Sequence, residues 1–521
     1  MRILLVSFQT NTETLGLRLL HHLLLDRGHS STLLFFPRGL EQRDFVDCFD
    51  WVSKWNPDAV GVSLMTEEFR YARRFTDEWK RRQPRPSPVI WGGVHPTVRP
   101  EECLESAYYV CIGEGEDALL DWLEALRKGN PDADIPNIAR KGGAGQIVQP
   151  GLRPLDHDLD QWHPLTHDIP NAHVLHKGRV RPLDAALFRR YSRYRGRVYS
   201  ALATRGCPLH CSFCVNSAMM KVYGGKALKI RKRRVSAVLA ELRIAVEAHP
   251  EILYVNFQDD CFLTLSEEWL EEFSERYPRE VGRPFIIRPI PTFVAERKLR
   301  LIRDAGLAWV FMGLQSGDEA MNRELYQRPQ SNVKFLEAAR VIDALGLGAA
   351  YDVIVDNPLE PEESTALTVD LLSRLPRPYQ LNIYSLTTYP GAPLAATLEA
   401  HGLVPPLQAY TKNYAAYRPS YYNRLLRMAP VLPSVWIRFL NRPAETRRAL
   451  HGWGLHLSRP VAFLLEPLSF LWLFFRASRW KPGAVAHTLT HFLMEGFYRI
   501  YLRRPAFSRA DAQPPTSSIG P

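Results

Sequence analysis

Along the first 130 residues, short runs of apolar residues alternate with stretches in which apolar residues recur every three or four positions. The apolar runs predict buried strands over 3–8, 31–37, 58–65, 88–93 and 108–116. The periodic stretches predict helices over 16–27, 43–55, 69–82 and 118–128. Strands that are apolar on both faces and alternate with helices form parallel sheets covered on both sides. The fold class is therefore α/β, beginning with a doubly wound domain over residues 1–130.

Glycine and proline interrupt this pattern between residues 131 and 195, where no apolar period lasts. We interpret this segment as a linker packed across two domains, with a hairpin near 138–148. From 196 to 402, strand-like and helical stretches alternate again. The helical stretches cover 235–248, 267–277, 296–305, 333–345 and 364–375. Repeated β/α units predict a barrel, or part of one, with its chemistry at the carboxyl ends of the strands.

Beyond residue 402 the pattern changes once more. Aromatic residues and arginines interleave in helical stretches that prolines interrupt, so we expect a helical extension over 403–510 and a polar tail over 511–521. One interpretation is a set of buried helices over the barrel mouth. The other is a basic, aromatic-edged surface that lies on a membrane or admits a greasy substrate. No RNA-binding module is recognisable, and no nucleic-acid partner is expected.

Composition narrows the classes of protein that fit this pattern. The chain has 521 residues and a formal net charge of +11, which favours an anionic ligand or surface. Seven cysteines are too few for a secreted disulfide scaffold of this length, and no signal peptide is recognisable. Val461–Phe475 is the closest candidate for a membrane span, but it is short and contains Glu466 and Pro467. We therefore expect a cytoplasmic protein without a spanning helix, which could contact the inner face of a membrane peripherally.

The ends of three predicted strands in the first domain are rich in glycine. Glycine lets the backbone approach a bulky ligand closely, where a Cβ atom would block it. The residues of interest at these ends are Ser63, Leu64, Met65, Gly92, Gly93, His95, Gly113, Glu114 and Gly115. Neither a dinucleotide fingerprint nor a phosphate-binding loop follows the first strand. From spacing alone, a flavodoxin-like domain without a cofactor fits as well as a ligand-binding one.

Three cysteines in the segment ALATRGCPLHCSFC (201–214) carry the most specific signal of the chain. Cys207, Cys211 and Cys214 directly follow a strand pattern, with three and then two residues between them. Three thiolates from one loop can bind three irons of a [4Fe–4S] cube and leave the fourth iron open to a chelating ligand. Phe213 can shield such a cluster and lie against a flat ring. A zinc site is the weaker alternative, because it needs a fourth ligand and His210 would be a cramped one.

This motif, with the strands that follow it, resembles the radical SAM superfamily as far as about residue 400. The resemblance implies a partial barrel of six β/α units, and a cluster whose open iron binds S-adenosylmethionine (SAM). It also implies SAM contacts from residues at two strand ends: Gln258, Asp259, Asp260, Gln315 and Ser316. A carboxylate at the first of these ends suits the methionine ammonium group. The alternative for that end is an acidic turn that caps the next helix.

The glycine-rich strand ends SLMT, WGGVHPTVRPEE and CIGEGE resemble the cobalamin-binding domain that precedes many radical SAM cores. The resemblance implies that the corrinoid lies on the strand ends and that its nucleotide tail inserts beside the sheet. The nine strand-end residues named above are then its candidate contacts. The Asp-x-His-x-x-Gly motif that supplies a cobalt ligand in better-known cobalamin domains is missing. His95 is therefore a candidate contact near the tail, or an ordinary loop histidine, rather than an expected cobalt ligand.

Together these resemblances imply a cobalamin-dependent radical SAM enzyme, with C-methylation of an unactivated carbon as the expected reaction. In such methyltransferases one SAM methylates cobalt and another yields the 5′-deoxyadenosyl radical that activates the substrate. Cyclisation or carbon–carbon coupling needs the same cofactors and stays open, as does a non-catalytic corrinoid or iron–sulfur sensor. The implied partners are a small-molecule or lipid substrate and an external electron donor such as flavodoxin or ferredoxin. No catalytic residue is assigned from the sequence.

Overall fold

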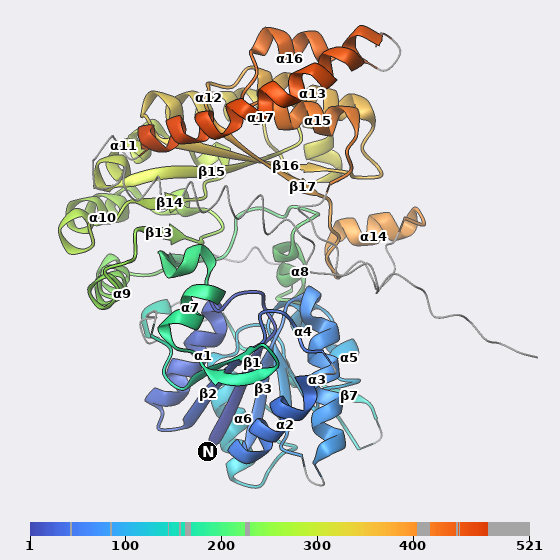
Figure 1. The fold of residues 1–521 in the computed structure, drawn as a ribbon. Helices are drawn as coiled ribbons and strands as arrows, with labels where there is room; N and C mark the ends of the chain where they lie inside the picture. Colours follow the sequence, from blue (N-terminus) through green and yellow to red (C-terminus); the bar gives the residue numbers. More distant parts are fainter. Residues whose placement is uncertain are drawn as a thin grey trace, which may run out of the picture.

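The computed structural model shows two α/β lobes stacked one above the other (Figure 1). It describes residues 1–477 except 42–43, 84–85, 144, 156–157, 162–167, 225–229, 404–416, 444–445 and 447–448. The lower lobe is formed by the N-terminal part of the chain, and the upper lobe contains the second sheet and the helices that follow it.

The lower lobe contains a nine-stranded sheet with the order β7-β6-β5-β4-β3-β1-β2-β8-β9. Its predicted strands are β1 (Arg2–Ser7), β2 (Ser30–Phe35), β3 (Ala59–Ser63), β4 (Val89–Gly92) and β5 (Tyr109–Cys111). These five strands are parallel, as predicted. The predicted helices are α1 (Leu15–Asp26), α2 (Phe45–Trp55), α3 (Phe69–Arg82) and α6 (Glu116–Arg127). Two short helices that the sequence analysis missed, α4 (Val94–Val98) and α5 (Pro100–Cys103), follow β4.

Apolar residues on both faces of each strand account for this arrangement. In β1, Leu4 and Val6 pack into the core beneath α2 and α3, whereas Ile3 and Leu5 pack into the core beneath α1 and α6. Because successive side chains of a strand point to opposite faces, one continuous apolar run fills two cores. The doubly wound fold is therefore confirmed.

The segment 131–195, predicted to be a linker, is largely part of the first sheet. The expected hairpin is present as β6 (Ile138–Lys141) and β7 (Ile147–Val148), which extend the sheet antiparallel from β5. At the opposite edge, β8 (Ala172–His176) pairs parallel with β2 and is followed by β9 (Arg179–Pro182) and α7 (Ala185–Tyr191). These edge strands are short and half polar, which explains why no apolar period revealed them.

The upper lobe contains six parallel strands in sequence order, which is the predicted partial barrel. They are β10 (Val198–Ala201), β13 (Tyr254–Phe257), β14 (Phe285–Ile287), β15 (Leu307–Gln315), β16 (Gly348–Val355) and β17 (Gln380–Ser385). The covering helices are α9 (Val235–Ala248), α10 (Glu267–Glu280), α11 (Glu296–Ala305), α12 (Asn332–Ala344) and α13 (Glu362–Ser373). All five helices lie where the sequence predicts them, whereas β14, which has only three residues, was not predicted.

Between β10 and β13, the chain forms a small substructure that faces the lower lobe. The two-residue strands β11 (Thr204–Arg205) and β12 (Arg231–Lys232) pair antiparallel, and α8 (Val215–Val222) follows the three cysteines. After β17, helix α14 (Pro393–Ala400) returns to the cysteine loop, where Leu394 N–H donates to the Ser212 carbonyl (2.9 Å).

The helical extension closes the bottom of the barrel instead of covering its mouth. It comprises α15 (Tyr421–Met428), α16 (Ser434–Leu440) and the long α17 (Ala449–Ala477), which crosses the upper lobe in Figure 1. Leu473 and Ala477 of α17 pack against Val198, Tyr254 and Trp309, which lie at the amino ends of their strands. The carboxyl ends, where the cysteine loop lies, are on the opposite side. The rest of the predicted extension, 478–510, and the tail, 511–521, lie outside the described residues.

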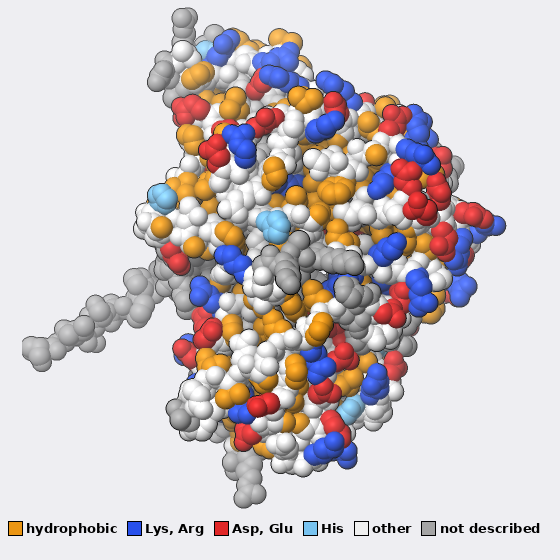
Figure 2. All heavy atoms as spheres, turned by 180° about the vertical axis from the view of Figure 1, so that it is seen from behind, with side chains coloured by type: hydrophobic (Ala, Val, Ile, Leu, Met, Phe, Trp, Pro, Cys, Tyr) orange, Lys and Arg blue, Asp and Glu red, His pale blue; other side chains and the backbone are white. Residues whose placement is uncertain are grey.

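One helix in the described part of the chain, His451–Ala477, is long and apolar enough to cross a membrane by length and composition. No such helix was predicted from the sequence, because Glu466 and Pro467 interrupt the apolar run. On the face seen in Figure 2, basic and acidic side chains are interspersed over both lobes, so the positive net charge is not gathered there into one patch.

Candidate active site

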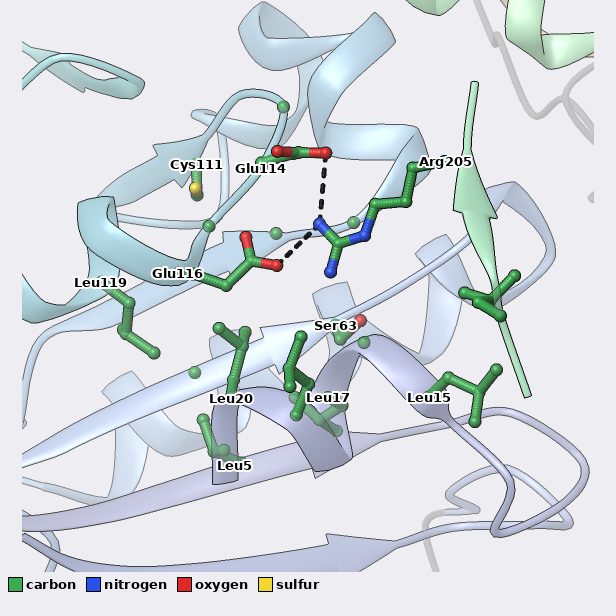
Figure 3. Close-up of a pocket in the computed structure, with 18 of the residues that line it drawn as sticks. Leu5, Leu15, Leu17, Leu20, Ser63, Cys111, Glu114, Glu116, Leu119 and Arg205 are labelled. Carbon is green, nitrogen blue, oxygen red and sulfur yellow. Dashed lines mark ion pairs between the residues drawn. The ribbon is translucent and has the colours of Figure 1, made fainter. Parts of the chain in front are cut away.

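A cavity of about 310 Å³ lies where the two lobes meet, at the carboxyl ends of the strands of the first sheet. Leu5, Leu17, Leu20 and Leu119 form its apolar floor between the sheet and helices α1 and α6 (Figure 3). Its other wall comes from the upper lobe, through Leu202, Thr204, Arg205, Arg233 and Glu241. The cavity thus combines an apolar slot with a charged rim that both lobes build.

Glycines keep this slot open. A Cβ atom at Gly61 would stand 2.8 Å from Leu5 Cδ2 and project into the floor of the cavity. Gly93 and Gly113 have φ values of 100° and 82°, which side-chain-bearing residues rarely adopt, and a Cβ at Gly113 would clash with the Tyr223 hydroxyl. A slot of this size and polarity suits the nucleotide tail of a corrinoid, so the residues present fit the group that the sequence predicts.

Six of the nine predicted cobalamin contacts line the cavity. They are Ser63, Gly92, Gly93, Gly113, Glu114 and Gly115. Leu64 is instead buried in the core beneath α3, and Met65 is exposed at the end of β3. Neither is among the residues that line the cavity.

His95 does not line the cavity either. Its imidazole is buried, with Nδ1 3.3 Å from Thr66 Oγ1, Nε2 3.6 Å from Glu102 Oε2 and its ring against Phe69. Burial, assisted by the charge of Arg99, lowers the pKa of His95 to about 4. The residue is therefore a neutral histidine buried between α3 and α4, and its predicted contact with the corrinoid is not supported.

Glu114 faces the cavity, but its carboxylate also joins the two lobes. It accepts from Arg231 Nη1 at 2.9 Å and lies 3.2 Å from Arg205 Nη1, which in turn lies 2.8 Å from Glu116 Oε1 (Figure 3). Burial would raise the pKa of Glu114, but the guanidinium groups of Arg231 and Arg205 outweigh it and lower that pKa. The rim of the cavity is thus an ion-pair network of two arginines and two glutamates.

Residues outside the predicted set hold this rim in place. Glu114 N–H donates to the Tyr223 hydroxyl (3.2 Å), and Gly113 N–H donates to Thr97 Oγ1 (3.0 Å). From the predicted linker, the Asn137 side-chain amide donates to the Ile112 carbonyl at 2.7 Å. The strand-end loop is therefore fixed from both lobes.

Ser212 anchors the cysteine loop to the segment 325–326 by two hydrogen bonds. Ser212 N–H donates to the Tyr326 carbonyl (2.8 Å), and its hydroxyl donates to the Leu325 carbonyl. Phe213 packs edge-on against the Tyr326 ring at a centroid distance of 5.4 Å. Phe213 is partly buried beside the cysteines, and its shielding of a cluster stays a prediction.

The three cysteines are free thiols that lie close enough to affect one another. Burial raises the pKa of Cys207 to about 12 and that of Cys214 to about 11, and the neighbouring cysteines and Asp260 add to both shifts. A cation or a cluster is therefore needed to hold these thiols as thiolates. Within the described ranges, no three His, Cys, Asp or Glu side chains close around a single metal ion. Thiolates that each bind a different iron of a cube stand farther apart, so that finding does not bear on the cluster.

A buried cation missed by the sequence analysis lies beside this loop. Arg328 Nη1 is 3.6 Å from Cys211 Sγ, and Arg328 Nη2 donates to the Gly313 carbonyl at 3.2 Å. Its charge also opposes the rise that burial causes in the pKa of Cys214. A guanidinium at this position stabilises negative charge on the loop, as a thiolate-bound cluster requires.

Asp259 and Asp260 are adjacent but differ completely in environment. Asp259 is fully buried and accepts from Ala203 N–H (3.1 Å), Thr204 N–H (2.5 Å) and Thr204 Oγ1 (2.6 Å). It braces the chain before the cysteine loop, so the predicted SAM contact at Asp259 does not fit. Asp260 is exposed, bonds to Asn216, and faces Cys207 and Cys214. Gln258 is partly exposed at the same strand end.

The two SAM contacts predicted at the second strand end, Gln315 and Ser316, also differ in accessibility. Ser316 is fully buried, and its hydroxyl donates to Glu360 Oε1 (2.9 Å), while the Tyr326 hydroxyl donates to Glu360 Oε2 (3.3 Å). Ser316 is therefore inaccessible to a ligand, and its expected SAM contact is not supported. Gln315 is partly exposed, has a φ of 67°, and lies against Gly313 beside Arg328. Gln315 stays available as a contact.

The inner face of the barrel carries polar side chains that no sequence motif predicted. Arg288 Nη1 donates to Asn256 Oδ1 (2.7 Å), and Asn382 Nδ2 donates to Asp352 Oδ1 (2.8 Å). Burial raises the pKa of Asp352, which the charge of Arg288 opposes. Successive side chains of a strand point to opposite faces. These polar groups therefore point into the barrel, while apolar residues of the alternate positions, such as Met312 and Leu314 of β15, fill the outer core.

The basic run 229–234 was interpreted as a solvated face, with phosphate or acidic substrate contact as the alternative. Lys229 lies outside the described residues, but Arg231 and Arg233 are buried at the lobe interface. Arg233 pairs with Glu241 Oε2 at 2.6 Å and with Asp160. Lys232 and Arg234 are exposed, so the solvated interpretation holds for these two residues and is wrong for Arg231 and Arg233. The acidic segment GEGE (113–116) is the sequence signal that could have predicted an ion pair with this basic run.

Taken together, these features define a two-domain α/β protein in which a glycine-walled cavity of corrinoid type adjoins a three-cysteine loop of cluster type. Two family models match the chain: the B12 binding domain over residues 1–123 and the Radical SAM superfamily over residues 202–372. The chain is a cobalamin-dependent radical SAM enzyme. Its cofactors are cobalamin, a [4Fe–4S] cluster and SAM.

Curated relatives match the chain over 45% to 76% of their own length. The chain is 26% identical over 387 residues to the uncharacterized methyltransferase PH0819 of Pyrococcus horikoshii, covering 72% of this chain and 76% of that protein. It is 25% identical over 347 residues to the cytidylyl-2-hydroxyethylphosphonate methyltransferase of Streptomyces wedmorensis, covering 62% of each. It is also 25% identical over 273 residues to the anaerobic magnesium-protoporphyrin IX monomethyl ester cyclase of Rubrivivax gelatinosus, covering 51% of this chain and 45% of that protein.

Solved structures confirm the fold. The cobalamin-dependent SAM radical enzyme OxsB with bound aqua-cobalamin matches with a TM-score of 0.63 at 15% identity, covering 96% of this chain and 80% of that one. The radical SAM methyltransferase TsrM from Kitasatospora setae, with cobalamin and a [4Fe–4S] cluster bound, matches with a TM-score of 0.62 at 19% identity, covering 78% and 79%.

Proposed function

We propose that this enzyme methylates a carbon atom of a small-molecule substrate. The observation that carries the proposal is the shared cavity: Leu202, Thr204 and Arg205 line the corrinoid-type slot, and Cys207 follows only two residues later. A methyl carrier on the strand ends and a cluster in the loop would therefore stand on either side of one reaction space. When bound, SAM and the cluster supply a substrate radical, and cobalamin supplies the methyl group.

The residues of the chain have distinct tasks in this proposal. Cys207, Cys211 and Cys214 hold the cluster, while Arg328 offsets its negative charge. Asp260 and Gln315 are the accessible candidates for SAM, and Asp260 suits the ammonium group. The glycine-walled slot excludes side chains so that the corrinoid tail can enter, and Ser63 and Glu114 offer polar contacts at its rim.

The inner face of the barrel supports a substrate with polar groups. Arg288, Asp352 and Asn382 can position such groups by charge and hydrogen bonds on the side where the two cofactors would meet. A small molecule with donors and acceptors fits this face better than a wholly apolar lipid chain. The enzyme also needs an external reductant, for which we propose flavodoxin or ferredoxin. All seven cysteines are free thiols, which supports a reducing compartment, the cytoplasm.

The test uses anaerobically prepared enzyme, SAM labelled at its methyl group, and reductant. Formation of 5′-deoxyadenosine together with labelled product supports the proposal. A variant with Cys207, Cys211 and Cys214 all replaced by Ala should lose iron and 5′-deoxyadenosine formation but keep corrinoid binding. Cys103→Ala, a buried cysteine of the first lobe, is the matched control and should keep both.

Cyclisation is the second candidate, favoured by the similarity to the magnesium-protoporphyrin cyclase. An unlabelled, cyclised product together with 5′-deoxyadenosine would establish it instead of methylation. Corrinoid and iron binding without any 5′-deoxyadenosine would identify a sensor and overturn both enzymatic proposals.

A further inference from the structure

Helix α17 presents a continuous apolar stripe to the outside of the molecule. We define the α17 stripe by its large side chains, which are between 49% and 69% exposed: Trp453, Leu457, Val461, Leu464, Leu468 and Trp472. These residues follow one another at intervals of three or four positions, so they share one face of the helix. At 1.5 Å per residue the stripe is about 28 Å long. A soluble monomer rarely exposes an apolar surface of this extent without a partner.

The charges of α17 lie outside this stripe. The helix has three Arg or Glu residues, Arg459, Glu466 and Arg476, and at 3.6 residues per turn none falls within the stripe. Glu466 pairs with Arg427 at 3.7 Å, and Arg476 Nη1 donates to Asp343 Oδ1 at 2.6 Å. The stripe is therefore an uninterrupted apolar face whose orientation the neighbouring ion pairs fix.

The opposite face of α17 is committed to the barrel. Leu455 and Ala462 are buried against α15 and α16, and Leu473 packs beneath the strands. A helix held in this way lies flat on the domain. If it crossed a membrane, it would have to abandon this packing and carry Arg459 and Glu466 into hydrocarbon. The stripe can instead bury its side chains in the interfacial layer of one leaflet.

The charge around the stripe complements an anionic surface. Eight arginines and two glutamates stand between residues 421 and 477, an excess of six positive charges (8 − 2). Arg427 and Arg438 are exposed on α15 and α16, which pack against α17, and Val435 of α16 is an exposed apolar residue. An apolar face bordered by arginines is the pattern of helices that lie in the surface of anionic bilayers.

We propose that the α17 stripe docks this enzyme on the surface of a bilayer that contains anionic lipid. The docking surface lies at the amino ends of the barrel strands, whereas the cysteine loop and the cavity lie at the carboxyl ends. Docking through the α17 stripe therefore holds the enzyme on the bilayer and leaves the reaction space accessible. This inference goes beyond the proposed function and does not depend on it.

The test is flotation of the full-length protein with vesicles of phosphatidylcholine alone or with about one third phosphatidylglycerol. Wild-type protein should float with the anionic vesicles, and added salt should weaken its binding. The double variant Leu464→Gln/Leu468→Gln should bind at least about tenfold more weakly, because two side chains no longer enter the apolar layer. Its melting temperature should not fall, since both side chains are exposed in the free protein.

The matched control is Val333→Gln/Leu367→Gln, which removes two equally exposed apolar side chains from α12 and α13, outside the stripe. This variant should float like the wild type. Equal flotation of both double variants would contradict the proposal, as would failure of the wild type to bind either vesicle. Self-association that the Leu464→Gln/Leu468→Gln variant abolishes, without vesicle binding by the wild type, would assign the stripe to a second copy and overturn the lipid proposal.

Discussion

Arg205 Nη1 lies 2.8 Å from Glu116 Oε1, so a residue two positions before the first cluster cysteine is paired with the first residue of a helix in the corrinoid-type lobe. Glu114 shares the same guanidinium at 3.2 Å. The pairing links the cysteine loop to the glycine-rich strand end through side chains that are mostly buried. It therefore fixes where one cofactor site stands relative to the other.

Replacing Arg205 with Gln should loosen this link. The change leaves Glu116 without its charged partner, and we expect a loss of about 2–3 kcal/mol in the stability of the lobe interface. Corrinoid occupancy should fall several-fold while iron content stays near that of the wild type. Optical spectra and iron assays of the anaerobic protein check this, with Arg127→Gln as control because its pair with Glu124 is on the surface. Unchanged corrinoid occupancy in the Arg205 variant would show that the pairing is incidental.

Replacing Gly61 with Val should close the corrinoid slot. The new side chain would start 2.8 Å from Leu5 Cδ2 and occupy the floor of the cavity. We expect corrinoid binding to drop by at least about tenfold because the tail loses its space. Cluster assembly should persist. Gly143→Val is the control, since a Cβ there meets nothing within 4 Å. Corrinoid binding that survives in the Gly61 variant would place the tail elsewhere.

The sequence predicted both sheets because most of their strands are continuous apolar runs flanked by periodic helices. β1 shows why: its four successive apolar residues, Ile3 to Val6, can be recognised without any knowledge of the strands they pair with. By contrast, β8 and β9 are short edge strands with polar residues, and β14 has only three residues. Their pairing is decided by distant neighbours, which local periodicity does not report.

The candidate site was predictable to a similar degree. The three cysteines and the glycine-rich ends could be found because their chemistry demands those residue types. Asp259 and Ser316 carry the right groups at the right strand ends, yet each is buried in hydrogen bonds to its own lobe. Arg328 went unnoticed because it comes to the cysteine loop from 117 residues away in the chain. Orientation and long-range approach are the two properties that residue identity alone does not reveal.

Replacing each of the two adjacent aspartates with asparagine should affect different properties: protein stability for Asp259 and SAM binding for Asp260. Asp259→Asn places a side-chain NH₂ group against backbone donors, so the protein should lose about 2–3 kcal/mol of unfolding free energy. Its folded fraction should still bind SAM. Asp260→Asn should leave the melting temperature unchanged but weaken SAM binding by roughly tenfold, because a charge-assisted bond is lost. Thermal melts and equilibrium binding of SAM to the reconstituted protein separate the two outcomes, and the reverse pattern would exchange their assigned roles.

Acid should destabilise the corrinoid-type lobe through two buried histidines. Burial lowers the pKa values of His21 and His95 to about 4, so the folded state resists their protonation. Their stabilising effect is complete above the unfolded pKa, about 6.5, and is lost as the pH falls toward 4. At about pH 5 the loss is about 2 kcal/mol for each histidine.

Melting temperatures at about pH 7.5 and about pH 5 check this linkage. The double variant His21→Asn/His95→Asn should show a smaller drop between the two pH values than the wild type. His401→Asn, on the surface of the second lobe, should drop as much as the wild type does. An equal drop in all three proteins would mean that other groups cause the acid sensitivity.

The strands contributed by 131–191 determine where this enzyme can be divided. A fragment that ended at residue 130 would expose both edge strands of the parallel sheet. Their unpaired backbone N–H and C=O groups could then pair with other molecules. Such a fragment should aggregate. A cobalamin-binding fragment that folds independently would instead extend through Tyr191, whose carbonyl accepts from Thr12 N–H. Any recombination that exchanges the two halves, in the laboratory or in evolution, must therefore cut in the few residues between α7 and β10.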